Sequence, residues 1–315
     1  MRLASSLALF FLIVLSSCGG TAPEQTAPVA DEVPERLLIY TVNEPLAYFA
    51  ERLGGNEVEV VFPAPADEDP AFWSPDAETI TAYQASDIIL LNGAGFAKWV
   101  ELATLPSSKL VDTTAGVADR LIELSGGVTH SHGPEGEHEH QGWAFTTWLD
   151  PTLALEQARA VAKALEQRRP ESAAAIQSNL VAMEADLTTL DARLAAAAIT
   201  IGDEPLLFSH PVYQYLIHRY ELNGHQVHWE PDVEPNDKAW SELGHILGHN
   251  PAKWMLWEGE PLEATVTGLE DRGISSVVFA PCANRPSEGD WLAVMTANAK
   301  ALESITEELP ADHAD

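Results

Sequence analysis

The chain has 315 residues, of which 46% are hydrophobic and 21% charged, a balance that supports one large or two medium-sized folded domains and argues against disorder. Its 48 Asp and Glu residues outnumber 17 Lys and Arg residues, so the formal net charge is -31. A surface this acidic repels nucleic-acid phosphates, which excludes nucleic acid as an expected partner. Such a surface also attracts cations. However, an acidic surface can serve solubility alone, so the net charge by itself identifies no ligand.

Residues 1–17 are predicted to be an export signal, because Arg2 precedes the apolar run Leu7–Leu15 and small residues follow. The run, at roughly nine residues, is too short to cross a bilayer. Leu15-Ser16-Ser17-Cys18 is similar to the bacterial lipobox, which predicts an acylated Cys18 and a lipid anchor on the periplasmic or cell-surface side. The alternative is an ordinary cleaved signal with an incidental cysteine.

Residues 18–35, rich in Pro, Ala and Thr, are expected to form a flexible tether. Residues 36–150 are predicted to form an N-terminal α/β lobe, because short β-rich runs alternate with helical patterns. The expected strands are Leu37–Val42, Val58–Phe62, Ile88–Asn92 and Leu110–Thr113, and the expected helices are Pro45–Leu53, Ala77–Ala85 and Ala94–Leu105. Such alternation indicates a small, mostly parallel sheet covered by helices.

A histidine-rich loop, residues 130–140, lies near the end of this lobe and contains His130, His132, His138 and His140. Each His-x-His pair places two imidazoles on one face of an extended strand, and Gly133-Pro134-Glu135-Gly136 has the composition of a turn. Two paired arms would bring four nitrogen donors together, a ligand set that suits zinc. The alternative is a solvated loop that binds metals loosely.

Residues 151–200 are predicted to be a helical connector. Ile176, Leu180, Met183, Leu187, Leu190 and Leu194 recur at spacings of four and three. A single helix from Pro170 to Ala198 would be on the order of 42 Å long. It would join the lobes as a rigid backbone with little hinge motion, whereas the alternative is a helical pair broken near Asp186.

Residues 201–315 are predicted to form a C-terminal α/β lobe. The expected strands are Leu206–Ser209, Gln226–Trp229, Trp254–Trp257 and Val277–Phe279. His210 follows the first of these strands, at a strand end where α/β proteins place ligands. A lone histidine is more often structural, and the spacing of His218, His225, His228, His245, His249 and His313 predicts no site. Cys282 is the one cysteine besides Cys18, so the lipidated chain has no intramolecular disulfide.

Together these features resemble the cluster A-I substrate-binding proteins of zinc and manganese ABC importers. The run from Ser86 to Trp99 is similar to the family's strand, Asn-Gly turn and helix, and Trp148-Leu149-Asp150-Pro151 matches its Trp-Leu-Ser/Asp-Pro signature. His210 with Tyr213 and Tyr215 matches the segment of the family's third metal ligand. The resemblance implies two lobes, a monomer, zinc or manganese as the bound metal, and an ABC permease as partner.

Three of the four ligand positions that the resemblance implies are occupied by other residues: Ala71, Thr146 and Ala280. One imidazole cannot hold zinc tightly in water. We therefore expect the histidine-rich loop to supply donors beside His210. Glu258, at another strand end, and Cys282, two residues beyond the altered carboxylate position, are further candidates. Phe72, Trp73, Trp143 and Phe145 flank the altered positions and either line a drier cleft or pack in the core.

An enzyme is the first alternative, since His-x-His occurs in metallohydrolases. The Asp-His that usually continues that motif is replaced by Gly133-Pro134, and no His-Glu-x-x-His or Gly-x-Ser-x-Gly motif is present, so we expect no catalysis. The second alternative is a protein without a transport role: a surface metal scavenger, a metal chaperone or a degenerate binding protein. It stays open because function resides in the binding site, and the metal site that the resemblance implies has changed.

Overall fold

A computed structural model describes residues 36–131 and 137–307, without the side chains of 125–141 and 306–307. The expected signal, Cys18, the tether, His132 and His313 lie outside the described residues. The described residues belong to one compact unit. Within the described part of the chain, no helix is both long enough and apolar enough to span a membrane.

The N-terminal lobe contains a four-stranded parallel sheet in the order β2-β1-β3-β4. Its strands are β1 (Leu37–Thr41), β2 (Val58–Val61), β3 (Ile88–Leu91) and β4 (Leu110–Asp112), and its helices are α1 (Glu44–Gly54), α2 (Ala77–Ala85) and α3 (Trp99–Leu102). Asn43 and Asp76 cap α1 and α2 by accepting hydrogen bonds from backbone amides in the first turn. The lobe therefore has the predicted α/β architecture.

The C-terminal lobe repeats this plan with parallel strands in the order β10-β9-β7-β8. Its strands are β7 (Leu206–Phe208), β8 (Gly224–Gln226), β9 (Trp254–Trp257) and β10 (Ser275–Val278), and its helices are α6 (Gln214–Tyr220), α7 (Asp237–His249), α8 (Glu263–Glu270) and α9 (Trp291–Glu307). All residues of β7 and β9 are buried, which explains their continuous apolar sequence.

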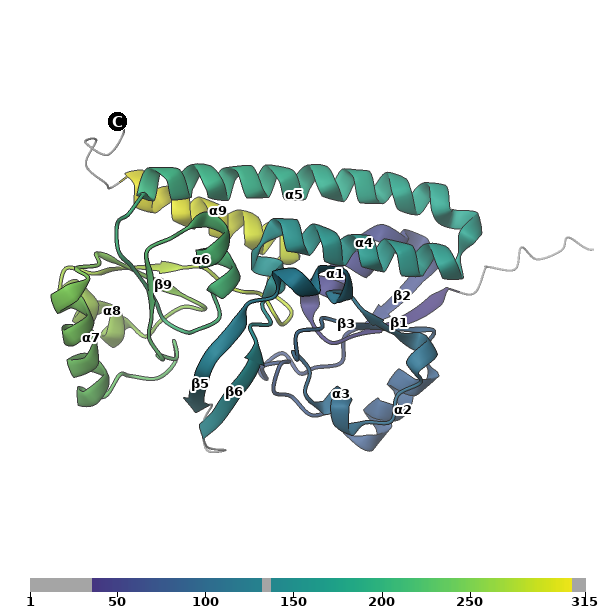
Figure 1. Cartoon of the computed structure of the whole chain (residues 1–315), viewed down its shortest axis with the longest axis horizontal. Helices are drawn as coiled ribbons and strands as arrows, with labels where there is room; N and C mark the ends of the chain where they lie inside the picture. Colours follow the sequence, from purple (N-terminus) through teal and green to yellow (C-terminus); the bar gives the residue numbers. More distant parts are fainter. Residues whose placement is uncertain (1–35, 132–136, 308–315) are drawn as a thin grey trace, which may run out of the picture. The chain divides into compact units, whose positions relative to one another are not determined.

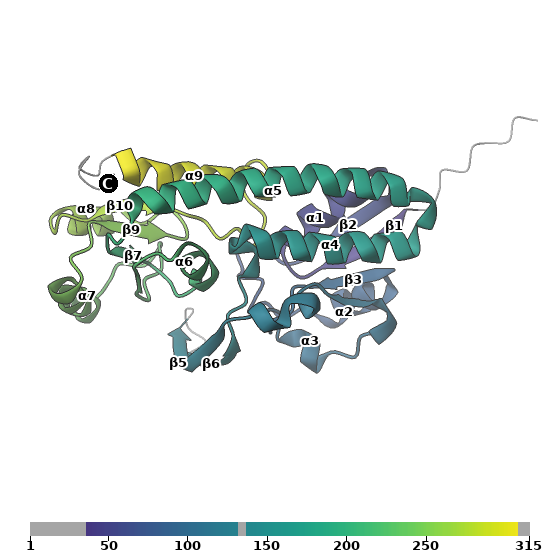
Figure 2. The ribbon, with the colours of Figure 1, turned by 45° about the horizontal axis from the view of Figure 1, so that its top comes forward.

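Two long helices connect the lobes, α4 (Pro151–Arg168) and α5 (Ala173–Ile201), and α5 contacts both α4 and α9 (Figures 1 and 2). The predicted apolar stripe of α5 is buried along its whole length. The alternative of a break near Asp186 is wrong, because the helix is continuous through this residue. The helix begins three residues later than predicted, since Pro170–Ser172 forms a 3-10 turn.

The histidine-rich segment lies in an antiparallel hairpin of β5 (Glu123–Ser131) and β6 (Glu137–Trp143), which extends away from α4 and α5 in both views (Figures 1 and 2). His130 is the register partner of His138, and Val128 that of His140. The two arms predicted from the His-x-His spacing are therefore paired strands.

Two predicted elements are wrong in extent. Only Trp99–Leu102 of the expected helix Ala94–Leu105 is helical, because Gly93, Ala94 and Gly95 all have positive φ and form a turn. The strand expected at Gln226–Trp229 ends at Gln226. Beyond it the chain still follows the end of β7, as the amide of Trp229 donates to the carbonyl of Ser209 at 2.7 Å.

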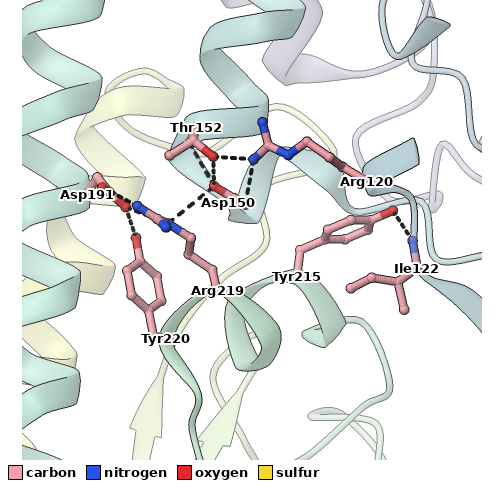
Figure 3. Close-up of polar contacts among 8 residues, drawn as sticks. All are labelled: Arg120, Ile122, Asp150, Thr152, Asp191, Tyr215, Arg219 and Tyr220. Carbon is pink, nitrogen blue, oxygen red and sulfur yellow. Dashed lines mark hydrogen bonds and ion pairs between the residues drawn. The ribbon is translucent and has the colours of Figure 1, made fainter. Parts of the chain in front are cut away.

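Helix α6 of the C-terminal lobe is bonded to the connector and to the base of the hairpin (Figure 3). Arg219 donates two hydrogen bonds to Asp191, of 3.1 and 2.7 Å, and lies 3.7 Å from Asp150, the residue that caps α4. The Tyr215 hydroxyl accepts from the amide of Ile122 at 3.2 Å and donates to the carbonyl of Ala144 at 2.9 Å. These bonds hold the segment after His210 against the N-terminal lobe.

Candidate metal centre

Three side chains meet at the carboxyl ends of the C-terminal sheet. His210 follows β7, Glu230 lies four residues after β8, and Glu258 directly follows β9. Because β7 pairs with β8 on one side and β9 on the other, the histidine lies between the two carboxylates. Strand order, rather than closeness in the sequence, brings these residues together.

The three residues offer ligand atoms that all lie within 4.8 Å of one another. The Nδ1 atom of His210 is 3.7 Å from Oε1 of Glu230 and 3.8 Å from Oε1 of Glu258. His210 is 4% exposed, whereas the two carboxylates are partly accessible. Two carboxylates so close together repel each other, and a cation between them and the imidazole relieves that repulsion.

One imidazole nitrogen and two carboxylate oxygens suit zinc, which binds such ligands with four- or five-fold coordination. Oxygen ligands also suit manganese. The geometry supports Glu258, a sequence-based candidate, as a neighbour of His210. Glu230 was missed, because its place beside His210 depends on the pairing of β8 with β7 and not on its local sequence.

The cluster lines a cavity of about 730 Å³ to which both lobes contribute residues. Phe72, Phe96 and Phe145 come from the N-terminal lobe, and Phe145 lies edge-to-face with Phe72 and with Phe96 at centroid distances of 6.4 and 5.3 Å. Of the four flanking aromatics singled out in the sequence, Phe72 and Phe145 line the cavity. Trp73 packs against a small buried cluster, and Trp143 is 43% exposed.

Other contacts engage the residues at the three positions where the resemblance implies further ligands. Ala71 is 2% exposed, and its amide donates to Oδ1 of Asp69 at 2.8 Å. The Thr146 hydroxyl donates to the carbonyl of Val212 at 2.5 Å. Ala280 exchanges two backbone hydrogen bonds with the side chain of Asn298.

Cys282 lines the same cavity but is not in the cluster of three. Burial, with a smaller contribution from Glu44 and Asp290, raises the pKa of its thiol to about 12. Metal ligation requires the thiolate, so this environment makes Cys282 a weak candidate in the metal-free protein.

His228 lies beside the cluster, with its ring centroid 5.9 Å from that of His210. Burial lowers its pKa below the ordinary value, while Glu230 and Glu242 act in the opposite direction. It is thus a second imidazole near the site, although sequence spacing gave it no role.

The backbone of the hairpin places His130, His138 and His140 on paired strands. Their side chains, and all of His132, lie outside the described residues, so their part in the centre stays a prediction.

Two tyrosines after His210 position the loop that carries it. The buried hydroxyl of Tyr213 donates to the carbonyl of Phe279 at 2.9 Å, and Tyr215 bonds to the base of the hairpin. Trp148, in the Trp-Leu-Asp-Pro segment, donates to the carbonyl of Pro281 at 2.8 Å. These bonds connect the strand ends on both sides of the cavity.

Curated proteins are similar in sequence to most of this chain. The zinc-binding protein AdcA of Streptococcus pyogenes serotype M3 is 23% identical over 290 residues, which are 86% of this chain and 56% of the relative. The chain therefore spans little more than half the length of the curated relatives it matches first. The manganese-binding lipoprotein MntA of Halalkalibacterium halodurans is 24% identical over 232 residues, covering 70% of this chain and 71% of MntA.

Solved structures confirm the two-lobed α/β fold. The Zn(II)-bound ZnuA-like domain of Streptococcus pneumoniae AdcA matches with a TM-score of 0.73 at 21% identity, covering 87% of this chain and all of that domain. The metal-dependent lipoprotein YcdH of Bacillus subtilis matches with a TM-score of 0.72 at 18% identity, covering 85% of this chain and 98% of YcdH.

The family described as "ZnuA: Zinc-uptake complex component A periplasmic" matches residues 39–305, which include both sheets, the connecting helices and the cluster of three. The chain therefore belongs to this family of zinc-uptake components.

Proposed function

We propose that this protein captures a transition-metal ion, foremost zinc, on the extracytoplasmic side of a membrane and delivers it to the permease of an ABC importer. The observation that carries the proposal is the cluster of His210, Glu230 and Glu258 in a cavity between two lobes of a zinc-uptake fold. Manganese is the second candidate metal, because two of the three ligands are carboxylates.

The cluster replaces the ligand set that the family resemblance implies. It combines His210 with two carboxylates of the same lobe. These ligand atoms support metal binding by a chain that has Ala71, Thr146 and Ala280 where the resemblance implies other ligands. We propose that His130, His132, His138 and His140 bind ions loosely, apart from the cluster, and so raise the local metal concentration, and that Cys282 is at most a weak ligand. The protein acts by binding and release, without catalysis.

The proposal also includes how the protein is held at the membrane. We propose that Cys18 is lipidated, that residues 18–35 form a tether, and that the folded body from residue 36 is a monomer. A lipid anchor would keep the binding protein near a permease in the same membrane. The acidic surface, with its net charge of -31, favours capture of cations from solution.

A surface metal scavenger is the competing function, favoured by the paired histidine-rich hairpin. Uptake of radioactive zinc by metal-starved cells separates the two functions. Deletion of the gene is expected to reduce uptake, and the His210→Ala variant is expected to fail to restore it.

His218→Ala is the matched control, because His218 lies exposed on α6 and outside the cluster. It should restore uptake fully. Zinc uptake that is unchanged by the deletion, although the purified protein binds zinc, would contradict a transport role and favour the scavenger.

A further inference from the structure

A second pair of metal-ligating side chains lies on α7, at the edge of the C-terminal lobe in both views (Figures 1 and 2). His245 and His249 are both exposed and are four residues apart in this helix. Residues at this spacing lie one above the other on the same helix face, with Cβ atoms roughly 5–6 Å apart. The helix therefore brings together two imidazoles at which the sequence predicts no site.

Two histidines at this spacing can chelate one metal ion, because the helix backbone holds both rings on the same side. Imidazole nitrogen suits zinc, nickel and copper, whereas manganese prefers carboxylate and water oxygens. The pair offers two protein ligands, so water completes the coordination shell of a bound ion. We expect a lower affinity than at the cluster of three, where two carboxylates add their charge to one imidazole.

The carboxyl end of α7 is electrostatically suited to a cation. His249 is the last residue of the helix, and the amide of Asn250 closes the last turn by donating to the carbonyl of Ile246 at 2.8 Å. The carbonyls of the last turn give this end of a helix a partial negative charge. Glu242 lies one turn before His245 on the same face, where it pairs with Lys238 at 3.4 Å. A metal ion at the two histidines is therefore close to the negative end of the helix dipole.

The sequence around the pair contains a short repeat. Leu243-Gly244-His245 recurs as Leu247-Gly248-His249, so a glycine precedes each histidine. Glycine destabilises a helix interior, and a Cβ atom at Gly244 or Gly248 would meet no side chain within 4 Å. Packing in this lobe does not require these glycines, and they leave the helix end intrinsically weak. A metal that bridges the two turns opposes this weakness, because metal binding is coupled to local folding.

We infer that His245 and His249 form a second metal site, which binds a divalent ion that prefers nitrogen ligands, such as zinc, nickel or copper. The bound ion connects the last two turns of α7 and stabilises them. The site discriminates against manganese, which the carboxylates of the cluster accept. The inference goes beyond the proposed function and does not depend on it, since the pair shares no residue with the cluster of His210, Glu230 and Glu258.

Hydrogen exchange measured by mass spectrometry tests the site, because it reports on α7 separately from the cluster and the hairpin. The full chain purified in detergent is compared without metal, with zinc chloride and with manganese chloride. Titration of the exchange rate with zinc gives the dissociation constant of the site. At a free zinc concentration ten times this constant, amides at the end of α7 should exchange about tenfold more slowly. Manganese at the same concentration should change the rate by less than about twofold.

His245→Ala and His249→Ala should each reduce the effect of zinc on α7 to less than about twofold, since one imidazole does not chelate. The double variant should lose no more than either single variant, because the two residues act as one unit. Alanine favours a helix more than histidine does, so this loss does not come from a weakened helix. His218→Ala is the matched control, because it removes an exposed histidine from α6 of the same lobe, and it should retain the tenfold effect.

Zinc protection of α7 that persists in both single variants would overturn the inference, as would equal protection by manganese. The His210→Ala chain separates the inference from the proposed function, and it should retain the effect of zinc on α7. Loss of that effect would show that protection spreads from the cluster, which overturns the inference and leaves the proposed function standing. Retained protection together with an unchanged affinity for the most tightly bound zinc would contradict the proposed function and support the site on α7.

Discussion

The carboxyl ends of the two parallel sheets differ in chemistry. In the N-terminal lobe, Gln157 of α4 bonds with Asn92, which follows β3, with Thr113, which follows β4, and with Thr147, at distances of 3.0 to 3.1 Å. These side chains are neutral and buried. In the C-terminal lobe, the corresponding ends carry His210, Glu230 and Glu258. One sheet end is thus a closed hydrogen-bond network that stabilises the fold, and the other is a charged cluster suited to a cation.

The largest expected effect concerns the reactivity of Cys282, which lies four residues beyond β10 and is not among the three residues of the charged cluster. Its pKa of about 12, against an ordinary 9.0, lowers the thiolate fraction at pH 8 by about a thousandfold. Alkylation by iodoacetamide, measured in a Cys18→Ser chain, should be slower than in urea by about that factor. Since the thiolate fraction rises with pH below the pKa, the rate should rise tenfold per pH unit. Equal rates in folded and unfolded protein would contradict this assignment.

His210 is expected to contribute most to metal affinity. His210→Ala removes the single nitrogen of the cluster and should weaken zinc binding by about a hundredfold or more, as measured by calorimetry with a competing chelator. His218→Ala should leave the affinity within about twofold. An unchanged affinity in His210→Ala would place the metal elsewhere.

A substitution at Gln157 tests whether the hydrogen-bond network at the carboxyl end of the N-terminal sheet stabilises the fold. Gln157→Leu removes three buried hydrogen bonds, those with Asn92, Thr113 and Thr147, and should lower the free energy of unfolding by about 2–4 kcal/mol in urea denaturation. Zinc affinity should change by less than about twofold. The exposed Gln177→Leu is the control, expected within about 0.5 kcal/mol. A Gln157 variant that retains full stability would show that the network is not structural.

Substitution of Glu258 should have two smaller effects: weaker zinc binding and a slightly more stable metal-free protein. Glu258→Gln is expected to weaken zinc binding by about tenfold, because it removes one charged ligand. The same change should raise the stability of the metal-free protein slightly, by about 0.5 kcal/mol, because it relieves repulsion with Glu230. Glu260→Gln, two residues away and exposed, should do neither. Weaker binding together with a less stable metal-free protein would argue for a structural role of Glu258.

The sequence predicts the regular parts of this fold well and the site only in part. The periodic apolar stripe from Ile176 to Leu194 predicts α5, since helix packing depends on spacing along one chain segment. His210 and Glu258 were found because each directly follows an apolar strand run. Glu230 was missed, since its place beside His210 depends on the pairing of β8 with β7 and on a loop of four residues after β8.

The turn at Gly93, Ala94 and Gly95 illustrates a second limit. The helix was expected to begin at Ala94, yet three successive positive φ angles delay its start to Trp99. Ala94 and Cys282 have positive φ although they are not glycine, and the local sequence of Cys282 carries no signal for this conformation. Tertiary contacts therefore decide the backbone where local propensity is neutral.

X-ray absorption at the zinc edge of the 1:1 complex tests the central claim most directly, namely that the C-terminal cluster alone holds the ion. We predict a zinc coordination shell with one imidazole and a majority of oxygen neighbours at about 2.0–2.2 Å. This shell should be unchanged when residues 130–140 are replaced by a Gly-Ser linker, and it should be altered in His210→Ala. A shell with several imidazoles that disappears with the hairpin would contradict the account.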